Sequence, residues 1–169
     1  MEPRKIMEPT RKPSTSDQEL REHLVALLRG GHAHITFDKA VRGFPVDRAG
    51  VRPPGLPHSA WELLEHIRLA QVDMLRFSQS ADYVSPPFPQ GYWPESAAPE
   101  RATQWNASIR QYRKDRAEFE EMILDPERNL RKKFPWGSGQ TVLREALTIA
   151  DHTSYHLGQL LLVRQLVEG

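Results

Sequence analysis

Cysteine is absent from this sequence of 169 residues, which excludes disulfide bonds, thiolate nucleophiles and cysteine-based zinc sites. No apolar run approaches the roughly 20 residues that a membrane-spanning helix needs. An excess of charge of either sign is also missing, because 23 Lys and Arg residues oppose 22 Asp and Glu residues for a net charge of +1. Such a balance creates no field that gathers nucleic acid or an anionic membrane surface, so we expect neither as a partner.

The length of the chain predicts one domain with a sizeable core. Residues 1–14 are charged, contain proline and have no apolar signal region, and we interpret them as a mobile leader. Residues 15–169 then form the single domain. Because the sequence shows neither a targeting segment nor a membrane span, we expect the protein in the cytoplasm.

Four segments have the pattern of helices. Ser16 and Ser59 each have a glutamate three residues later, a capping box that satisfies free backbone donors at a helix start. Pro99 suits the first turn of a third helix, which ends at Asp125, and a fourth begins near Thr141. Apolar residues recur at helical spacing over about residues 16–29, 59–78, 99–124 and 141–169. We therefore expect an all-α fold, a four-helix bundle whose apolar stripes face one another.

Two long connections join these predicted helices, at residues 31–57 and 80–99. Both are rich in Pro and Gly, yet they also contain aromatic residues: Phe37, Phe44, Tyr83, Phe88, Tyr92 and Trp93. Long loops in a compact domain are typically functional or disordered. We expect these loops to pack onto the bundle, either as the roof of a pocket or as a plain cover for the core, with a short helix at about residues 37–41. Connections of this length also allow neighbouring helices to run parallel.

His152 and His156 lie four residues apart in the last predicted helix. Side chains at this spacing share a helix face, so both imidazoles can reach one metal ion. They lie beside the apolar stripe that contains Leu160, and burying two imidazoles without partners is costly. Two interpretations stay open: hydrogen-bonded core histidines, or ligands of a shared cation. His66, in the middle of the second helix, would complete a three-histidine site for one divalent metal ion, with positions left for water or substrate.

The remaining four histidines are weaker candidates. We expect His23, His32 and His34 at the surface, whereas His58 immediately precedes the second helix and is a candidate for the mouth of a pocket.

A reaction at this site would need groups besides the metal ligands. Glu62, Glu65 and Asp73 on the second helix are candidates for a general base, although we also expect Glu62 to take part in the cap. Tyr155 and Gln159 are candidates for hydrogen-bond partners of the ligands.

Two segments, Ser59–Ile67 and Ala150–Gln159, resemble the DinB-like (DinB/YfiT) metalloenzymes. Gly91–Pro94 and Gly139–Thr141 are similar to one branch of that family, and the resemblance extends from about residue 16 to residue 167. It implies a four-helix bundle with a long crossover. It also implies that the three histidines named above bind zinc, nickel or a similar divalent ion, and that the protein is a homodimer.

The resemblance implies more than one activity. Better understood members of the family transfer or isomerise substrates with low-molecular-weight thiols such as bacillithiol and mycothiol, and other members are labelled hydrolases. We favour a metal-dependent enzyme that activates an external thiol for transfer to an electrophilic small molecule, since no general base is evident. The alternatives are hydrolysis by a metal-activated water, and a non-catalytic module in which the metal braces the bundle and the aromatic loops bind a partner.

Overall fold

The computed structural model describes residues 15–169, and the leader predicted for residues 1–14 lies outside the described part. Within residues 15–169 the chain forms α-helices and two short 3-10 helices, and no strand. These elements are α1 (Thr15–Arg29), α2 (Phe37–Val41), η1 (Val46–Arg48), α3 (Ala60–Gln79), η2 (Gln90–Tyr92), α4 (Ala102–Leu124) and α5 (Val142–Glu168). The predicted all-α class is confirmed, and the short helix expected at residues 37–41 is α2.

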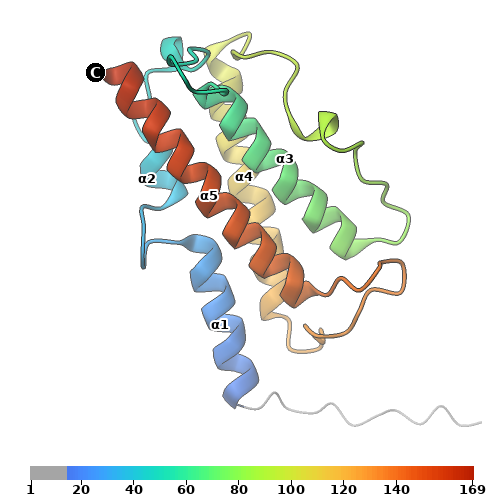
Figure 1. Cartoon of the computed structure of the whole chain (residues 1–169). Helices are drawn as coiled ribbons and strands as arrows, with labels where there is room; N and C mark the ends of the chain where they lie inside the picture. Colours follow the sequence, from blue (N-terminus) through green and yellow to red (C-terminus); the bar gives the residue numbers. More distant parts are fainter. Residues whose placement is uncertain (1–14) are drawn as a thin grey trace, which may run out of the picture.

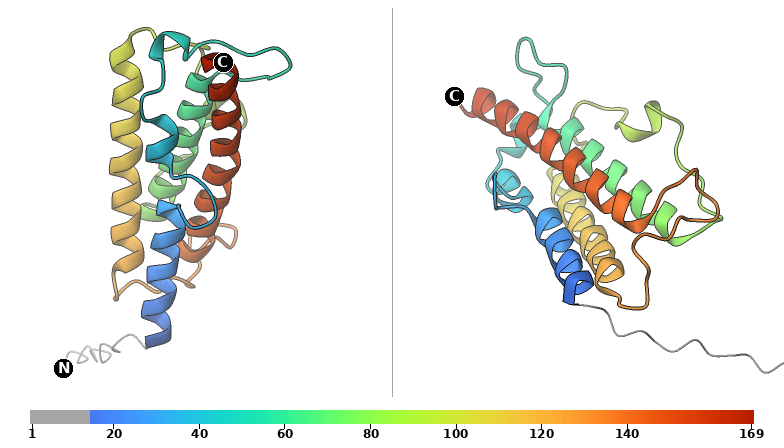
Figure 2. Two further views of the ribbon diagram at one scale, coloured as in Figure 1. Left: turned by 90° about the vertical axis from the view of Figure 1, so that its left-hand side faces the viewer. Right: turned by 60° about the horizontal axis from the view of Figure 1, so that its bottom comes forward.

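The four long helices pack side by side as a bundle (Figure 1). Helix α3 contacts both α4 and α5, and α1 contacts both α4 and α5. Figure 2 shows α2 beyond the end of α1, so that α1 and α2 follow one another along the length of α5. Both helices contact α5. The bundle therefore has one corner that is built from two pieces of chain.

The connection between α3 and α4 is the long crossover that the sequence predicted. It returns along the outside of the bundle to the end where α3 began, so α3 and α4 run parallel (Figure 1). Helix α5 runs in the opposite direction, and α3 has its most extensive helix contacts with it. The crossover consequently lies beside α3, which η2 contacts.

Side-chain caps determine where α3 and α5 begin. The hydroxyl of Ser59 accepts the backbone N–H of Glu62 at 3.2 Å, and the carboxylate of Glu62 accepts the N–H of Ser59 at 2.8 Å, so the predicted capping box is present. The hydroxyl of Thr141 accepts the N–H of Arg144 at 3.1 Å and caps α5. These two caps set the starts of the helices that carry the candidate site.

Two predicted helix starts were wrong. Ser16 lies inside α1, which already includes Thr15. Helix α4 begins at Ala102 and not near Pro99, because the side chain of Gln104 accepts the N–H of Glu100 at 2.6 Å and holds the preceding residues in a non-helical conformation.

The buried apolar residues form two clusters along the bundle. Leu64, Ile67 and Leu160 are fully buried in the cluster at the α2 end, and Leu75 and Ile149 belong to the cluster at the α1 end. On α5 the second cluster ends at Ala150 and the first begins at Leu157. The two histidines of α5 therefore lie where one core cluster gives way to the other. None of the helices in residues 15–169 is long and apolar enough to cross a membrane.

Candidate metal centre

Three histidine side chains from α3 and α5 come together in the structure. The Nε2 atoms of His66 and His152 lie 3.0 Å apart. The ring of His156 has its centre 4.4 Å from that of His66 and 4.5 Å from that of His152. One ring nitrogen from each of the three lies within 4.8 Å of the other two. The packing of α3 on α5 thus brings together the three residues that the sequence predicted as metal ligands.

Burial keeps these imidazoles neutral. His66 and His156 expose only 8% and 9% of their surface, and His152 is half-buried. Desolvation is the main cause that lowers the pKa of all three, and for His152 the nearby His156 and His66 add to it and bring the pKa to about 4. A neutral imidazole has a free nitrogen lone pair, so near neutral pH all three rings can act as ligands.

Hydrogen bonds fix which nitrogen two of the three rings present. The backbone carbonyl of Tyr92 accepts a proton from Nδ1 of His66 at 2.7 Å, and the side-chain oxygen of Gln159 accepts one from Nδ1 of His156 at 2.7 Å. An oxygen acceptor requires Nδ1 to carry the hydrogen, which leaves Nε2 with the lone pair. Such outer hydrogen bonds commonly orient metal-bound histidines. Gln159 therefore contacts one of the candidate ligands.

The donor set fits a metal ion. Two imidazole nitrogens that bind one ion at about 2.0–2.1 Å lie about 3 Å apart, as the Nε2 atoms of His66 and His152 do. Among the described residues, the cluster contains no carboxylate and no fourth histidine. Three neutral nitrogens leave coordination positions for water or substrate, which is typical of catalytic sites and not of structural ones.

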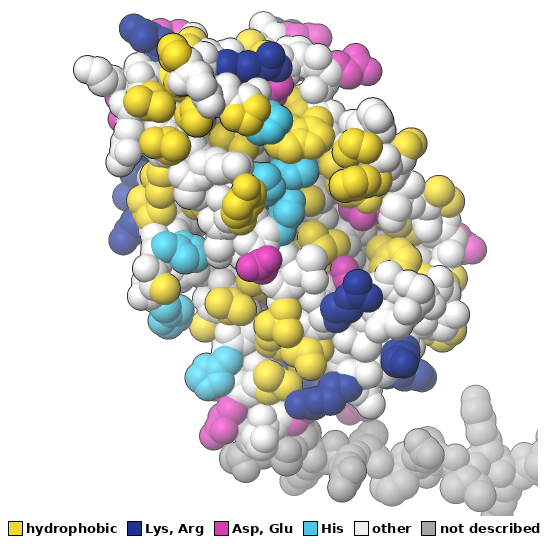
Figure 3. Space-filling model, in the orientation of Figure 1, with side chains coloured by type: hydrophobic (Ala, Val, Ile, Leu, Met, Phe, Trp, Pro, Cys, Tyr) yellow, Lys and Arg dark blue, Asp and Glu magenta, His cyan; other side chains and the backbone are white. Residues whose placement is uncertain are grey.

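An aromatic residue of the crossover covers one face of the centre. The ring of Trp93 stacks on His66 with 3.8 Å between the ring centres and 3° between the planes, and His58 stacks with Trp93 at 4.0 Å and 17°. In Figure 3, histidine side chains gather at the surface in the middle of this face with hydrophobic side chains around them. The loop thus covers the cluster without closing it.

The local fold of the crossover explains how Trp93 reaches the site. A Cβ atom at Gly91 would lie 2.4 Å from the Cβ of Pro86, so only glycine allows the chain to fold this closely. The hydroxyl of Tyr92 also donates to the carboxylate of Asp73 on α3 at 2.8 Å. Tyr92 and Trp93 consequently contact α3 at two points, two helical turns apart.

Only some of the aromatic residues in the two long connections cover the histidine cluster. Phe37 and Phe44 are buried in the core, and Phe88 is 85% exposed. Of the two roles that the sequence left open for these loops, Trp93 covers the site, whereas Phe37 and Phe44 cover the core. His58, which the sequence suggested for the mouth of a pocket, stacks on Trp93. The contribution of the Tyr92 carbonyl was not predicted, and its only signal was the similarity of Gly91–Pro94 to one branch of a known family.

The three candidate bases on α3 have other partners. Glu62 is buried, belongs to the cap of α3 and accepts hydrogen bonds from Arg52, one of them at 2.8 Å. Glu65 accepts from the guanidinium of Arg68 at 3.0 and 2.6 Å. Each carboxylate has a partner, and none belongs to the histidine cluster.

The other sequence candidates lie further out. Tyr155 is 65% exposed, but its ring meets that of His156 edge to face with 4.8 Å between the ring centres, and its hydroxyl accepts a hydrogen bond from Gln159 at 3.3 Å. His23, His32 and His34 are exposed. His34 approaches the hydroxyl of Ser154 at 3.0 Å.

Fold and site together define an all-α bundle protein with a histidine cluster able to hold one metal ion. The comparison with protein families agrees with this class, because the DinB superfamily matches residues 32–160, a range that includes all three histidines. The chain belongs to the DinB superfamily. Neither the search of curated proteins nor the search of solved structures returned a match.

Proposed function

We propose that this protein is a metal-dependent enzyme that activates an external small thiol and transfers it to an electrophilic small molecule. The observation that carries the proposal is the open cluster of His66, His152 and His156, with neutral rings and no carboxylate. A divalent ion held by three neutral imidazoles keeps its full charge and lowers the pKa of a thiol or a water molecule beside it. We propose zinc or nickel as that ion, since imidazole suits both.

The thiol has to come from outside, because the chain has no cysteine. In the transfer, the sulfur forms a bond to an electrophilic carbon while the bond from that carbon to an epoxide oxygen or a halide breaks. The proton of the thiol passes to the epoxide oxygen or to water. We place this reaction in the cytoplasm, where small thiols remain reduced.

The surroundings of the site support thiol transfer over hydrolysis. Hydrolysis usually requires a general base positioned near the water, but Glu62 and Glu65 are paired with arginines, and Asp73 holds the hydroxyl of Tyr92 and does not belong to the histidine cluster. A thiol that has lost its proton is already a strong nucleophile, so the transfer requires no such base. The chain's own residues then have to hold the rings, orient the substrate and limit the access of water.

Cobalt substitution tests the proposal directly. Metal-free protein is loaded with Co²⁺, and the absorption spectrum is followed during titration with 2-mercaptoethanol. A new thiolate-to-cobalt charge-transfer band that saturates with the thiol, and that is lost in the variant His152→Ala, is the expected result. Bound cobalt without any thiol-dependent band would reject the thiol chemistry. Subsequent consumption of 1,2-epoxybutane only in the presence of thiol would separate transfer from hydrolysis.

A further inference from the structure

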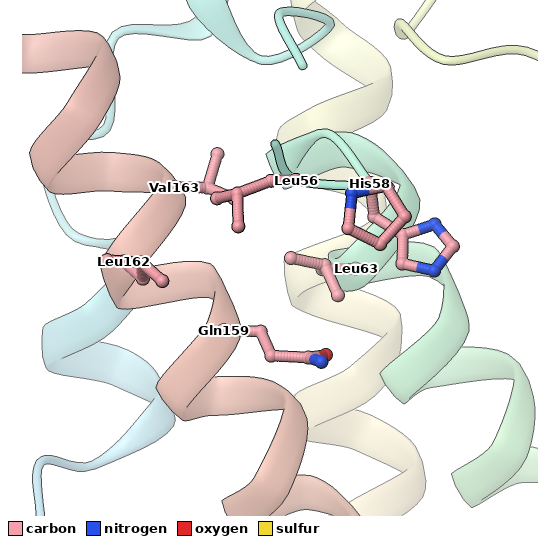
Figure 4. A pocket seen from close by; sticks show the side chains of 7 residues that line it. Leu56, His58, Leu63, Gln159, Leu162 and Val163 are labelled. Carbon is pink, nitrogen blue, oxygen red and sulfur yellow. The ribbon is translucent and has the colours of Figure 1, made fainter. Parts of the chain in front are cut away.

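An apolar pocket lies between α5 and the start of α3, beside the histidine cluster. Its volume is about 40 Å³. Figure 4 shows Leu162 and Val163 of α5 on one side of it and Leu63 of α3 with Leu56 on the other. The two polar residues in its lining are His58 and Gln159.

Both polar residues of the pocket also belong to the surroundings of the metal centre. Gln159 lines the pocket and accepts the hydrogen bond from Nδ1 of His156. His58 lines the pocket and stacks on Trp93, whose ring in turn stacks on His66. The pocket and the histidine cluster therefore share one wall, which Gln159 forms together with His58 and Trp93.

The lining determines what the pocket can bind. It contains no Lys, Arg, Asp or Glu, so a charged group placed there would lose its hydration without a partner. Its volume is below the range of about 300–1,000 Å³ that is typical of sites for drug-sized ligands. The matching occupant is a short, uncharged, apolar chain of a few carbon atoms.

We propose that this pocket holds the uncharged apolar part of the electrophilic substrate, and that its shared wall with the histidine cluster places the reactive carbon at the metal centre. The proposal rests on the proposed function and adds the substrate class: small neutral electrophiles with an alkyl chain, such as alkyl epoxides or alkyl halides. Charged analogues of equal length are excluded by the lining.

Binding of simple alcohols tests the pocket without metal, thiol or turnover. Metal-free protein is titrated with 1-propanol to 1-hexanol, and the methyl signals of Leu63 and Val163 are followed by NMR spectroscopy. Both residues should show saturable shifts, and the dissociation constant should fall about fourfold for each added methylene until the chain fills the pocket. Hexanoate, which has the length of hexanol and a negative charge, should bind at least ten times more weakly than hexanol.

Two tryptophan substitutions on α5 form a matched pair. Leu162 is 45% exposed and lines the pocket, and Leu166 is 55% exposed and does not. Leu162→Trp should weaken hexanol binding at least tenfold by filling the pocket, whereas Leu166→Trp should leave it unchanged. If Leu162→Trp does not fold, the chain-length series and hexanoate on the parent still decide the question.

Methyl shifts that do not depend on chain length, equal binding of hexanoate, or hexanol binding that survives Leu162→Trp would each overturn the pocket assignment. The two proposals fail separately. If the alcohols bind as expected but no cobalt–thiol band appears, the pocket assignment stands and the thiol chemistry is rejected. If the band appears but the alcohols do not bind as expected, only the pocket assignment is rejected.

Discussion

At the residue scale, Gln159 has a double role because it contacts a candidate ligand and lines the apolar pocket. Gln159→Leu removes the oxygen that holds the Nδ1 proton of His156, so this ring becomes free to rotate or to change its tautomer. We expect the metal affinity to fall about 10- to 100-fold, as for other outer hydrogen bonds of metal-bound histidines. Competition with a chelator of known affinity measures the change.

Gln159→Glu is the matched control, since a carboxylate oxygen can still accept the same hydrogen bond. It should retain most of the affinity that Gln159→Leu loses. Equal zinc affinities for the parent and for Gln159→Leu would show that Gln159 does not orient His156.

The lowered pKa values of the histidines predict how the stability of the metal-free protein depends on pH. Burial, aided by the neighbouring histidines, shifts the pKa of His152 from its usual 6.5 to about 4. Between these values the unfolded chain binds a proton at His152 that the folded chain does not bind, so the free energy of unfolding rises with pH in this window. The contribution of neutral His152 to the free energy of unfolding is therefore fully present above pH 6.5. It should be lost progressively as the pH falls towards 4, and the loss should level off below that value.

Urea unfolding at several pH values in the presence of a chelator measures this slope. His152→Asn should show a shallower slope than the parent, because the variant has lost this titrating group. An identical slope in both proteins would contradict the assigned burial of His152.

Individual residues also show how far the sequence could predict the site. His66 was added for its position in the middle of a second helix, and helical spacing selected His152 and His156, because a regular helix fixes which side chains share a face. Helical spacing gave no position for Trp93 or for the Tyr92 carbonyl. Tyr92 ends the short 3-10 helix η2 and Trp93 follows it, in a crossover whose path depends on contacts such as that of Gly91 with Pro86.

At the scale of secondary-structure elements, the start of α3 connects the helix to the crossover. The hydroxyl of Ser59 accepts from the N–H of Glu62 and donates to the carbonyl of Ala97 at 2.5 Å. Ser59→Ala removes both interactions, and we expect a loss of about 1–2 kcal/mol in the free energy of unfolding. Thr141→Ala, which removes only the cap of α5, should cost about 1 kcal/mol.

Urea denaturation of both variants checks this comparison. If Ser59→Ala is no more destabilising than Thr141→Ala, the bond between the helix start and the crossover contributes nothing measurable.

Helix starts were predictable where a side chain supplies a local cap, as at Ser59 and Thr141. The start near Pro99 was wrong because proline is compatible with a first turn without requiring one. Gln104 instead accepts the N–H of Glu100, which keeps the residues before α4 out of the helix. Side-chain bonds of this kind are not visible in apolar periodicity.

At the scale of the whole molecule, the two core clusters stabilise the bundle, and the histidines lie at their junction on α5. The predicted class follows from four apolar stripes, but the filling of one corner by α1 and α2 together does not. It depends on how a long connection folds back onto α5.

The homodimer implied by the family resemblance stays a prediction. Leu147, Tyr155, Leu162 and Leu166 are exposed along one face of α5, and this face would be the one covered. Sedimentation of the parent should then give a dimer, and Leu147→Glu combined with Leu166→Glu a monomer. A monomeric parent would contradict the prediction, and a dimeric double variant would place the interface elsewhere.

The central claim is that His66, His152 and His156 hold one metal ion, and metal content tests it most directly. Untagged protein is loaded with zinc or nickel, passed over a desalting column and analysed by mass spectrometry, beside His66→Ala and the control His23→Ala, which changes an exposed histidine on α1. We expect about one metal ion per chain in the parent and in the control, and little in His66→Ala with its helical content intact. Metal retained by His66→Ala, or none in the parent after loading, would contradict it.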